Sequence, residues 1–176
     1  MNVKKAVITL LLICGVAPAQ GKGFHRFEQS HFTAEDASVR KPVRIPEGVL
    51  AVLRKDEVVG TALENENIPA DKMPLSWFSA SAIHLSNPEQ VDLVVMAVGT
   101  LRGSNMTTFW VFCATAQGYE LVLRAPAHDL MAKNTRWKRH RDIELTSMTA
   151  VQISTVLCRF DGERYTGYRT SSQPIR

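Results

Sequence analysis

The sequence lacks the short motifs by which many catalytic and nucleotide-binding sites are recognised. Its 176 residues contain no nucleophile elbow, no phosphate-binding P-loop, no dinucleotide fingerprint, no zinc-ligand spacing and no His-Glu-x-x-His helix. These absences argue against the enzyme classes that carry such motifs. They leave open an enzyme whose catalytic groups come from distant parts of the chain.

Cysteine is scarce. Cys14 lies in the N-terminal hydrophobic segment, which leaves Cys113 and Cys158 as the two thiols of a processed chain. Each falls within a predicted strand, and we predict that the two lie on adjacent or facing strands. In an oxidising compartment a disulfide between them would stabilise the fold by about 3 to 4 kcal/mol in the loop-entropy model. The alternative is two buried free thiols, because Cys is among the most buried residue types.

Long hydrophobic runs are confined to the N-terminus, where residues 1–19 have the pattern of a secretory signal peptide. Two lysines precede an apolar run over 6–16, and Ala-Pro-Ala precedes the expected cut after Ala19. The run is shorter than the roughly 20 residues that span a bilayer. We therefore expect a periplasmic or secreted protein with no integral membrane span. A lipoprotein anchored at Cys14, which the bulky Ile13 disfavours, and an uncleaved anchor are the alternatives.

An excess of either charge is also missing. Without the signal peptide the chain carries 19 basic and 17 acidic residues, so its overall charge favours no class of partner. One segment departs from this balance, because residues 133–141 hold five cations and no acid around one tryptophan. The candidate binding residues of this basic loop are Lys133, Arg136, Trp137, Lys138, Arg139 and Arg141. They could bind an anionic ligand and stack a ring on the tryptophan, while a solvated loop is the plainer interpretation.

What the chain has in abundance is β-prone sequence divided by turn residues. We predict strands at 77–85, 91–98, 107–114, 119–124, 143–147, 151–160 and 164–168. The long connection 125–141 is expected to be a loop. Two helices are expected at 47–54 and 57–64, because apolar residues recur there at i, i+4 spacing, and Asp56 could cap the second.

These elements predict an α+β fold in which an N-terminal helical pair packs on a roughly seven-stranded antiparallel sheet. The expected organisation is a signal peptide at 1–19, an irregular lead-in at 20–44, a single α+β domain at 45–170 and a frayed tail at 171–176. One face of the sheet would then be free of helices and available for a ligand.

A resemblance is carried by SNPEQVDLVVMAVGTLRGSNMTTFWVF, followed by YELVL, DIEL and RFDGERYTGY. This stretch resembles a group of small secreted bacterial proteins of no assigned activity, and its strand and turn units are similar to single FG-GAP-type β-blades. The resemblance spans residues 78–168 and implies a secreted interaction domain. FG-GAP blades bind calcium at an Asp-rich turn, but the matching stretch 87–92 departs from that pattern because it has too few carboxylates.

The leading hypothesis is a non-enzymatic binding module whose ligand is a protein partner in the cell envelope. A small extracytoplasmic hydrolase that uses His84 or His128 as its base is one alternative, and polyanion binding through the basic loop is another. No cofactor is expected. No metal is expected either, since His25 and His31 have no nearby carboxylate or Cys partner in the sequence.

Overall fold

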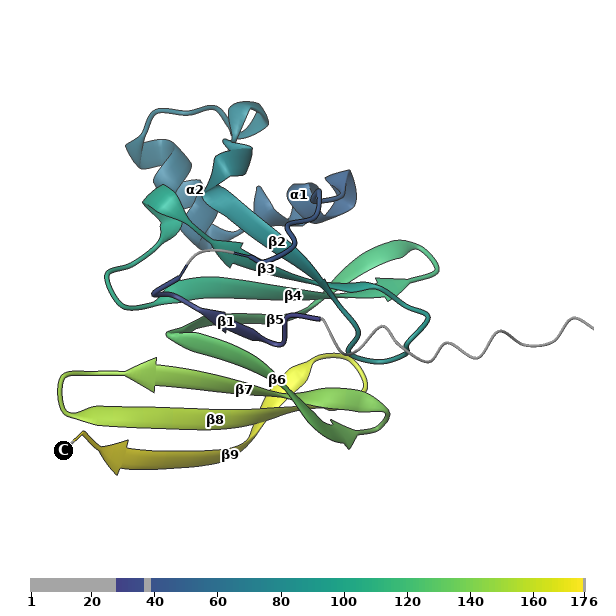
Figure 1. Ribbon diagram of the computed structural model, residues 1–176. Coiled ribbons are helices and arrows are strands. Elements are labelled where there is room, and N and C mark those ends of the chain that lie inside the picture. The colour runs from purple at the N-terminus through teal and green to yellow at the C-terminus, as the bar shows by residue number, and fades with distance from the viewer. Residues whose placement is uncertain (1–27, 37–38, 176) are drawn as a thin grey trace, which may run out of the picture.

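The computed structural model describes residues 28–36 and 39–175. It shows a pair of helices, a four-stranded sheet and a five-stranded sheet stacked as three layers (Figure 1). The expected signal peptide, Cys14 and His25 lie outside the described residues. None of the described helices is long and apolar enough to cross a membrane.

The middle layer is an antiparallel sheet of four strands in sequential order. These strands are β2 (Phe78–Ile83), β3 (Asp92–Ala97), β4 (Thr107–Thr115) and β5 (Gly118–Ala127). All six residues of β3 are buried, as are the first seven of β4. Such continuous burial means that both faces of the sheet centre are covered.

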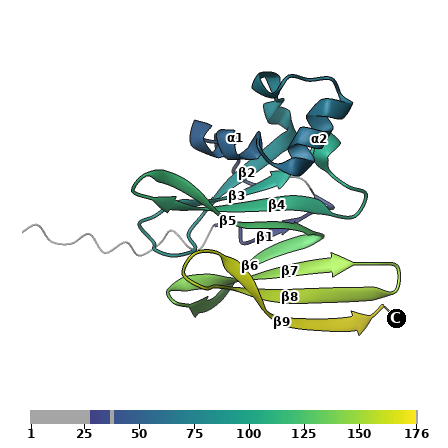
Figure 2. The same ribbon diagram turned by 180° about the vertical axis from the view of Figure 1, so that it is seen from behind.

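The outer layer is an antiparallel sheet of five strands in the order β1-β6-β7-β8-β9. Its strands are β1 (His31–Thr33), β6 (Asp129–Trp137), β7 (His140–Met148), β8 (Gln152–Phe160) and β9 (Tyr165–Pro174). Only His128 separates β5 from β6, so the chain passes from one sheet to the other at that residue. The view from behind shows β9 at the outer margin of this sheet (Figure 2).

The helices α1 (Glu47–Leu53) and α2 (Glu57–Asn65) cover the face of the four-stranded sheet that lies away from the five-stranded one. Asp56 caps α2, because its carboxylate accepts a hydrogen bond from the Val58 amide. The same carboxylate accepts from Trp110 Nε1 on β4 and Arg124 Nε on β5. One side chain thus ties the start of a helix to two strands. Short 3₁₀ turns occur at Ala70–Lys72, Leu75–Trp77 and Gly99–Leu101.

The middle sheet separates two hydrophobic cores. Side chains such as Val95 and Trp110 face the helices and share a core with Leu53 of α1. Alternate residues such as Val94 and Val111 face the five-stranded sheet, where Ile143 of β7 packs against them. Full burial of one large apolar side chain stabilises a fold by about 1.5 to 3 kcal/mol. The side chains on both faces of the middle strands therefore contribute to the stability of the fold.

The α+β class is correct, but the single sheet of about seven strands is wrong. The described residues form nine strands in two sheets, and the helices lie on the smaller sheet. The face predicted to be free of helices is covered by the second sheet. The unbroken apolar run of residues 93–97 was the available signal, since a strand with one solvated face alternates apolar and polar residues.

Three segments expected to be irregular are strands. Residues 31–33 of the expected lead-in form β1, which pairs with β6. The expected loop 125–141 contains the end of β5, the whole of β6 and the start of β7. Residues 171–174 of the expected frayed tail continue β9, where their backbone pairs with β8. The local sequence did not indicate a strand in these three segments, because pairing with a neighbouring strand is what orders each of them.

Cys113 of β4 and Cys158 of β8 are both buried in the core between the two sheets, as expected for facing strands. They are free thiols, so the predicted disulfide is absent. Burial raises the pKa of Cys113 to about 12 and that of Cys158 to about 11. The second interpretation, two buried free thiols, describes the structure.

Candidate binding surface

The basic loop is a β-hairpin, and its cations lie on β6, on β7 and in the turn between them. Lys138 and Arg139 form a two-residue connection between paired Trp137 and His140. Both have positive φ, 45° and 71°, the pattern of a type I′ turn. The prediction that this segment lies outside the strands is therefore wrong. We call residues 133–141 the basic hairpin below.

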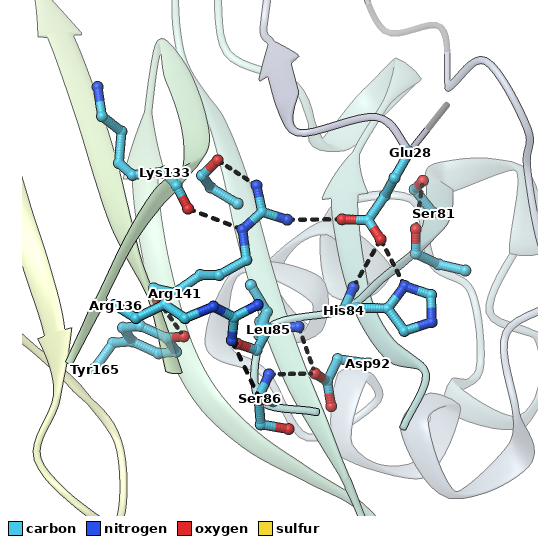
Figure 3. Close-up of polar contacts among 12 residues, drawn as sticks. Glu28, Ser81, His84, Leu85, Ser86, Asp92, Lys133, Arg136, Arg141 and Tyr165 are labelled. Carbon is cyan, nitrogen blue, oxygen red and sulfur yellow. Dashed lines mark hydrogen bonds and ion pairs between the residues drawn. The ribbon is translucent and has the colours of Figure 1, made fainter. Parts of the chain in front are cut away.

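Arg141 is buried and serves as an internal anchor of the basic hairpin (Figure 3). Its Nη1 donates to Glu28 Oε1 at 2.7 Å, while Nε and Nη2 donate to the backbone carbonyls of Lys133 and Ala132. The other oxygen of Glu28 accepts from the His84 amide at 3.1 Å and lies 2.6 Å from His84 Nδ1. This network joins the lead-in, the end of β2 and the β6–β7 hairpin, so Arg141 is not offered to a ligand.

Arg136 is likewise bound within the protein. Its Nη1 donates to the carbonyls of Leu85, Ser86 and Arg139, which fixes the β2–β3 connection against the hairpin turn. Asp92 completes this junction, because its buried carboxylate accepts from the amides of Leu85 and Ala114. Asp92 is the last residue of the stretch 87–92 that matches the calcium-binding turn of FG-GAP blades. Backbone amides already use its oxygens.

Two further cations of the basic hairpin have partners. Lys133 Nζ pairs with Glu144 at 3.2 Å, and Lys138 Nζ donates to the carbonyl of Asp161 in the β8–β9 turn. Of the five, Arg139 alone has a side chain without a hydrogen bond or ion pair to any residue that the structure describes. The positive charge read from the sequence is therefore largely engaged inside the fold.

An aromatic row, which we define as Trp137, Arg159 and Tyr168, lies beside the basic hairpin and presents two exposed rings. Trp137 is 47% exposed and Tyr168 60%. The Arg159 Cζ atom lies 5.0 Å from the Trp137 ring centroid and 3.8 Å from that of Tyr168. Asp142 lies 3.6 Å from Arg159 Nε and accepts from the Thr135 hydroxyl at 2.7 Å. A buried carboxylate thus forms an ion pair, without a hydrogen bond, with the cation that contacts both rings.

One margin of the five-stranded sheet is β9, and the three-residue strand β1 forms the other. Nine of the ten residues of β9 are exposed, and β9 pairs with β8 on one side and with no other described strand on the other. Two exposed apolar side chains lie where β8 starts and β9 ends, at Val151 and Ile175. An end strand of this length presents a row of backbone donors and acceptors to solvent.

The histidines proposed as catalytic bases do have carboxylate neighbours. His84 contacts Glu28, as described above, and His128 lies 3.2 Å from Asp129 and 3.5 Å from Glu35. The nearby Ser81 hydroxyl is buried and donates to the Ala82 carbonyl. The arrangement therefore supplies carboxylate and imidazole groups, with no serine hydroxyl that accepts or donates to either ring among the residues described.

Two cavities lie around the helices. One of about 440 Å³ is lined by α1, the 3₁₀ turns and β2, and includes Arg54, Leu50 and Phe78. A second of about 490 Å³ lies between α2 and residues 67–70. Neither His84 nor His128 lines either cavity. Within the described ranges, three or more His, Cys, Asp or Glu side chains nowhere gather as metal ligands would.

Comparison with known proteins gave no match to a protein-family model, to a curated protein or to a solved structure. The likeness to FG-GAP-type blades thus stays a prediction. Function has to be argued from the surface itself.

Sequence reasoning singled out Trp137 but missed Arg159 and Tyr168. Arg159 lies between apolar strand residues and Tyr168 in a short predicted strand, so neither stood out locally. Strand pairing brings them together, with a register shift beside Cys158 that makes Tyr168 an extra residue in β9. A search for exposed aromatics on paired strands would have found the row only once the register was known.

Proposed function

We propose that the protein is a non-enzymatic binding module of the periplasm or the secreted fraction, which holds an extended segment of a protein partner along β9. The observation that carries the proposal is the free edge of this ten-residue strand, nine of whose residues are exposed. An added strand would satisfy the outward backbone N–H and C=O groups. Each such hydrogen bond contributes about 0.5 to 1.5 kcal/mol net.

The far half of β9 has few of the features that usually protect an edge strand from pairing. Residues 170–173 read Thr-Ser-Ser-Gln and carry no charge. Natural sheets protect edges with charged side chains, bulges or covering elements. The register shift that places Tyr168 lies near the other end of the strand. Residues 170–173 are therefore the part of β9 on which a partner strand would pair.

Charge indicates the kind of partner. Residues 164–175 include Arg164 and Arg169 and no acidic residue. A second copy of this strand would bring two more arginines to the edge, whereas a segment with acidic side chains would bring opposite charge. We therefore favour an acidic extended segment of a different protein over self-association.

The test uses a pair of proline variants at neighbouring positions. Successive backbone N–H groups of a strand point to opposite edges, so Ser171→Pro and Ser172→Pro each remove one: one N–H faces β8 and the other faces the free edge. The variant that loses the β8 bond should show a lower melting temperature. The other should keep its melting temperature yet lose the partner captured by wild-type mature protein from a cell-envelope extract.

Mass spectrometry identifies the captured protein, and a synthetic peptide of its extended segment then replaces the extract. Strand addition is supported if the proline variant that keeps its melting temperature loses binding. Equal retention by wild type and both variants would overturn it. A dimer seen by light scattering, and abolished in the same variant, would identify a second copy as the occupant.

The hydrolase alternative rests on the Glu28–His84 contact at 2.6 Å. A carboxylate that orients an imidazole is a recurrent part of such sites. Against it, Arg141 binds the other oxygen of Glu28, and this network is explained by its structural links. Ester hydrolysis that is present in wild type and lost in His84→Ala, while His128→Ala retains it, would revive this alternative.

Most of the cations that supported the polyanion alternative are bound within the protein. Arg136 and Arg141 hold backbone carbonyls, and Lys133 pairs with Glu144. The exposed turn, Lys138 and Arg139, remains. Heparin retention that falls in the double variant Lys138→Ser/Arg139→Ser would support it, and unchanged retention would end it.

A further inference from the structure

We propose that the aromatic row of Trp137, Arg159 and Tyr168 is a binding site for the pyranose rings of a glycan. The site is separate from the β9 edge, since it uses side chains on the outer face of the five-stranded sheet. Neither of the described helices covers that face (Figure 1). The ligand is a neutral or weakly charged sugar polymer, either a cell-wall strand or a free oligosaccharide.

The first argument is the chemistry of the two exposed rings. An aromatic ring carries negative potential on its face and positive potential at its edge. The C–H groups on one side of a pyranose ring are slightly positive, so that side stacks on the aromatic face. Trp137 is the sole exposed tryptophan of the three, since Trp77 and Trp110 are buried in the core beneath the helices. Trp137 and Tyr168 contact the same cation and so form one exposed aromatic patch, and a contiguous patch marks a binding surface more often than a single exposed side chain does.

The second argument is preorganisation. Arg159 contacts both rings through cation–π interactions, with its Cζ atom 5.0 Å from the Trp137 centroid and 3.8 Å from that of Tyr168. The buried Asp142 carboxylate forms an ion pair with Arg159 Nε at 3.6 Å, and its other oxygen accepts a hydrogen bond from the Thr135 hydroxyl. The rings are therefore fixed relative to one another before a ligand arrives, which lowers the entropic cost of binding.

The third argument distinguishes a sugar from a polyanion. A phosphate-rich ligand needs several free cations along its path. Here four of the five cations of the basic hairpin have internal partners, and Arg159 faces Asp142. The terminal N–H groups of Arg159 have no hydrogen-bond partner among the described residues and can donate to sugar hydroxyls. Two exposed rings and one guanidinium with available N–H groups suit a ligand that stacks and makes a few hydrogen bonds.

The experiment measures whether a glycan shields Trp137. Acrylamide quenching of tryptophan fluorescence in the mature protein is followed with added chitohexaose, and co-sedimentation is followed with purified peptidoglycan sacculi. We expect at least one probe to bind, with protection of the exposed tryptophan from acrylamide. Binding only to sacculi would identify a wall polymer, and binding to chitohexaose would show that a free oligosaccharide suffices.

Variants separate stacking from charge. Tyr168→Ala should weaken binding at least tenfold while Tyr168→Phe retains it, because the ring and not the hydroxyl is needed. Tyr119→Ala, a partly buried tyrosine of the other sheet, and Arg139→Ser are the matched controls and should bind as wild type at low and high salt. Failure of both probes to bind, equal binding by Tyr168→Ala, or a loss that follows Arg139 and salt would overturn the proposal.

Discussion

Arg139 and Arg141 lie two residues apart in one hairpin and have opposite environments. The Arg141 guanidinium is buried against Glu28 and two backbone carbonyls, whereas Arg139 is exposed in the turn. Local sequence shows two similar cations. Only burial separates the one that stabilises the fold from the one available to a ligand.

We therefore expect Arg141→Met to lower the free energy of unfolding by about 3 to 5 kcal/mol, because it leaves the Glu28 carboxylate buried without its cation. Arg139→Met, the matched control, should change it by less than about 0.5 kcal/mol. Urea denaturation followed by circular dichroism measures both. Similar small effects at the two positions would contradict the anchoring role assigned to Arg141.

At the scale of elements, Asp56 connects helix α2 to the sheet. Burial alone would raise the pKa of Asp56, but hydrogen bonds from Arg124, Trp110 and the Val58 amide outweigh burial and lower it. A carboxyl with a lowered pKa in the folded state contributes stability that is present above the unfolded pKa, near 4, and is lost as pH falls through the folded value.

Asp56→Ala should thus destabilise the protein by about 2 to 4 kcal/mol near neutral pH, through loss of the cap and of the charged hydrogen bonds. The difference from wild type should shrink below about pH 4, as Asp56 becomes protonated. The neighbouring exposed Glu57→Gln is the control. Urea melts at pH 7 and pH 3 provide the comparison, and a difference that stays constant with pH would refute this assignment.

The turn of the basic hairpin carries conformational strain. Neither Lys138 nor Arg139 favours the positive φ that the type I′ turn requires, and the cost for a residue with a Cβ is about 1 to 2 kcal/mol. Asparagine followed by glycine is the pair that such a turn prefers. The double substitution Lys138→Asn/Arg139→Gly should therefore raise the free energy of unfolding by about 1 to 2 kcal/mol.

The control variant, at Gly118, should change the free energy of unfolding in the opposite direction. Gly118, the first residue of β5, has φ of 126° with no heavy atom near the position of an added Cβ, so Gly118→Ala should destabilise through backbone conformation alone. Urea melts of both variants measure the effect. A hairpin variant no more stable than wild type would mean that the turn is not strained.

For the whole molecule, the two thiols report whether the sheets separate. Cys113 and Cys158 belong to different sheets and share the core between them. Their raised pKa values, about 12 and about 11, keep both as thiols at pH 8, and the thiolate is the reactive form.

Native mature protein should therefore react with Ellman's reagent only as fast as the sandwich opens, with both cysteines labelled together. Denatured, unreduced protein should release two equivalents at once. Rapid labelling of the native protein would contradict the closed core. No labelling after denaturation would mean that the two are bridged in solution.

Much of the architecture could be predicted from the sequence because it is encoded locally. The helices at Glu47–Leu53 and Glu57–Asn65 lie within one residue of the expected ranges, since spacing and the Asp56 cap act over a few residues. Each of the seven expected strands starts within about three residues of an observed strand for the same reason. Turn residues and apolar runs determine where these helices and strands begin and end.

Tertiary structure alone decided the number of sheets, the partner of each cation and the aromatic row. These depend on which strands pair and in what register, and pairing is settled by contacts between residues far apart in the chain. Residues 133–141 show this most clearly. Their composition indicated a basic loop, but strand pairing turned it into a hairpin and Glu28, 113 residues away, bound its buried arginine.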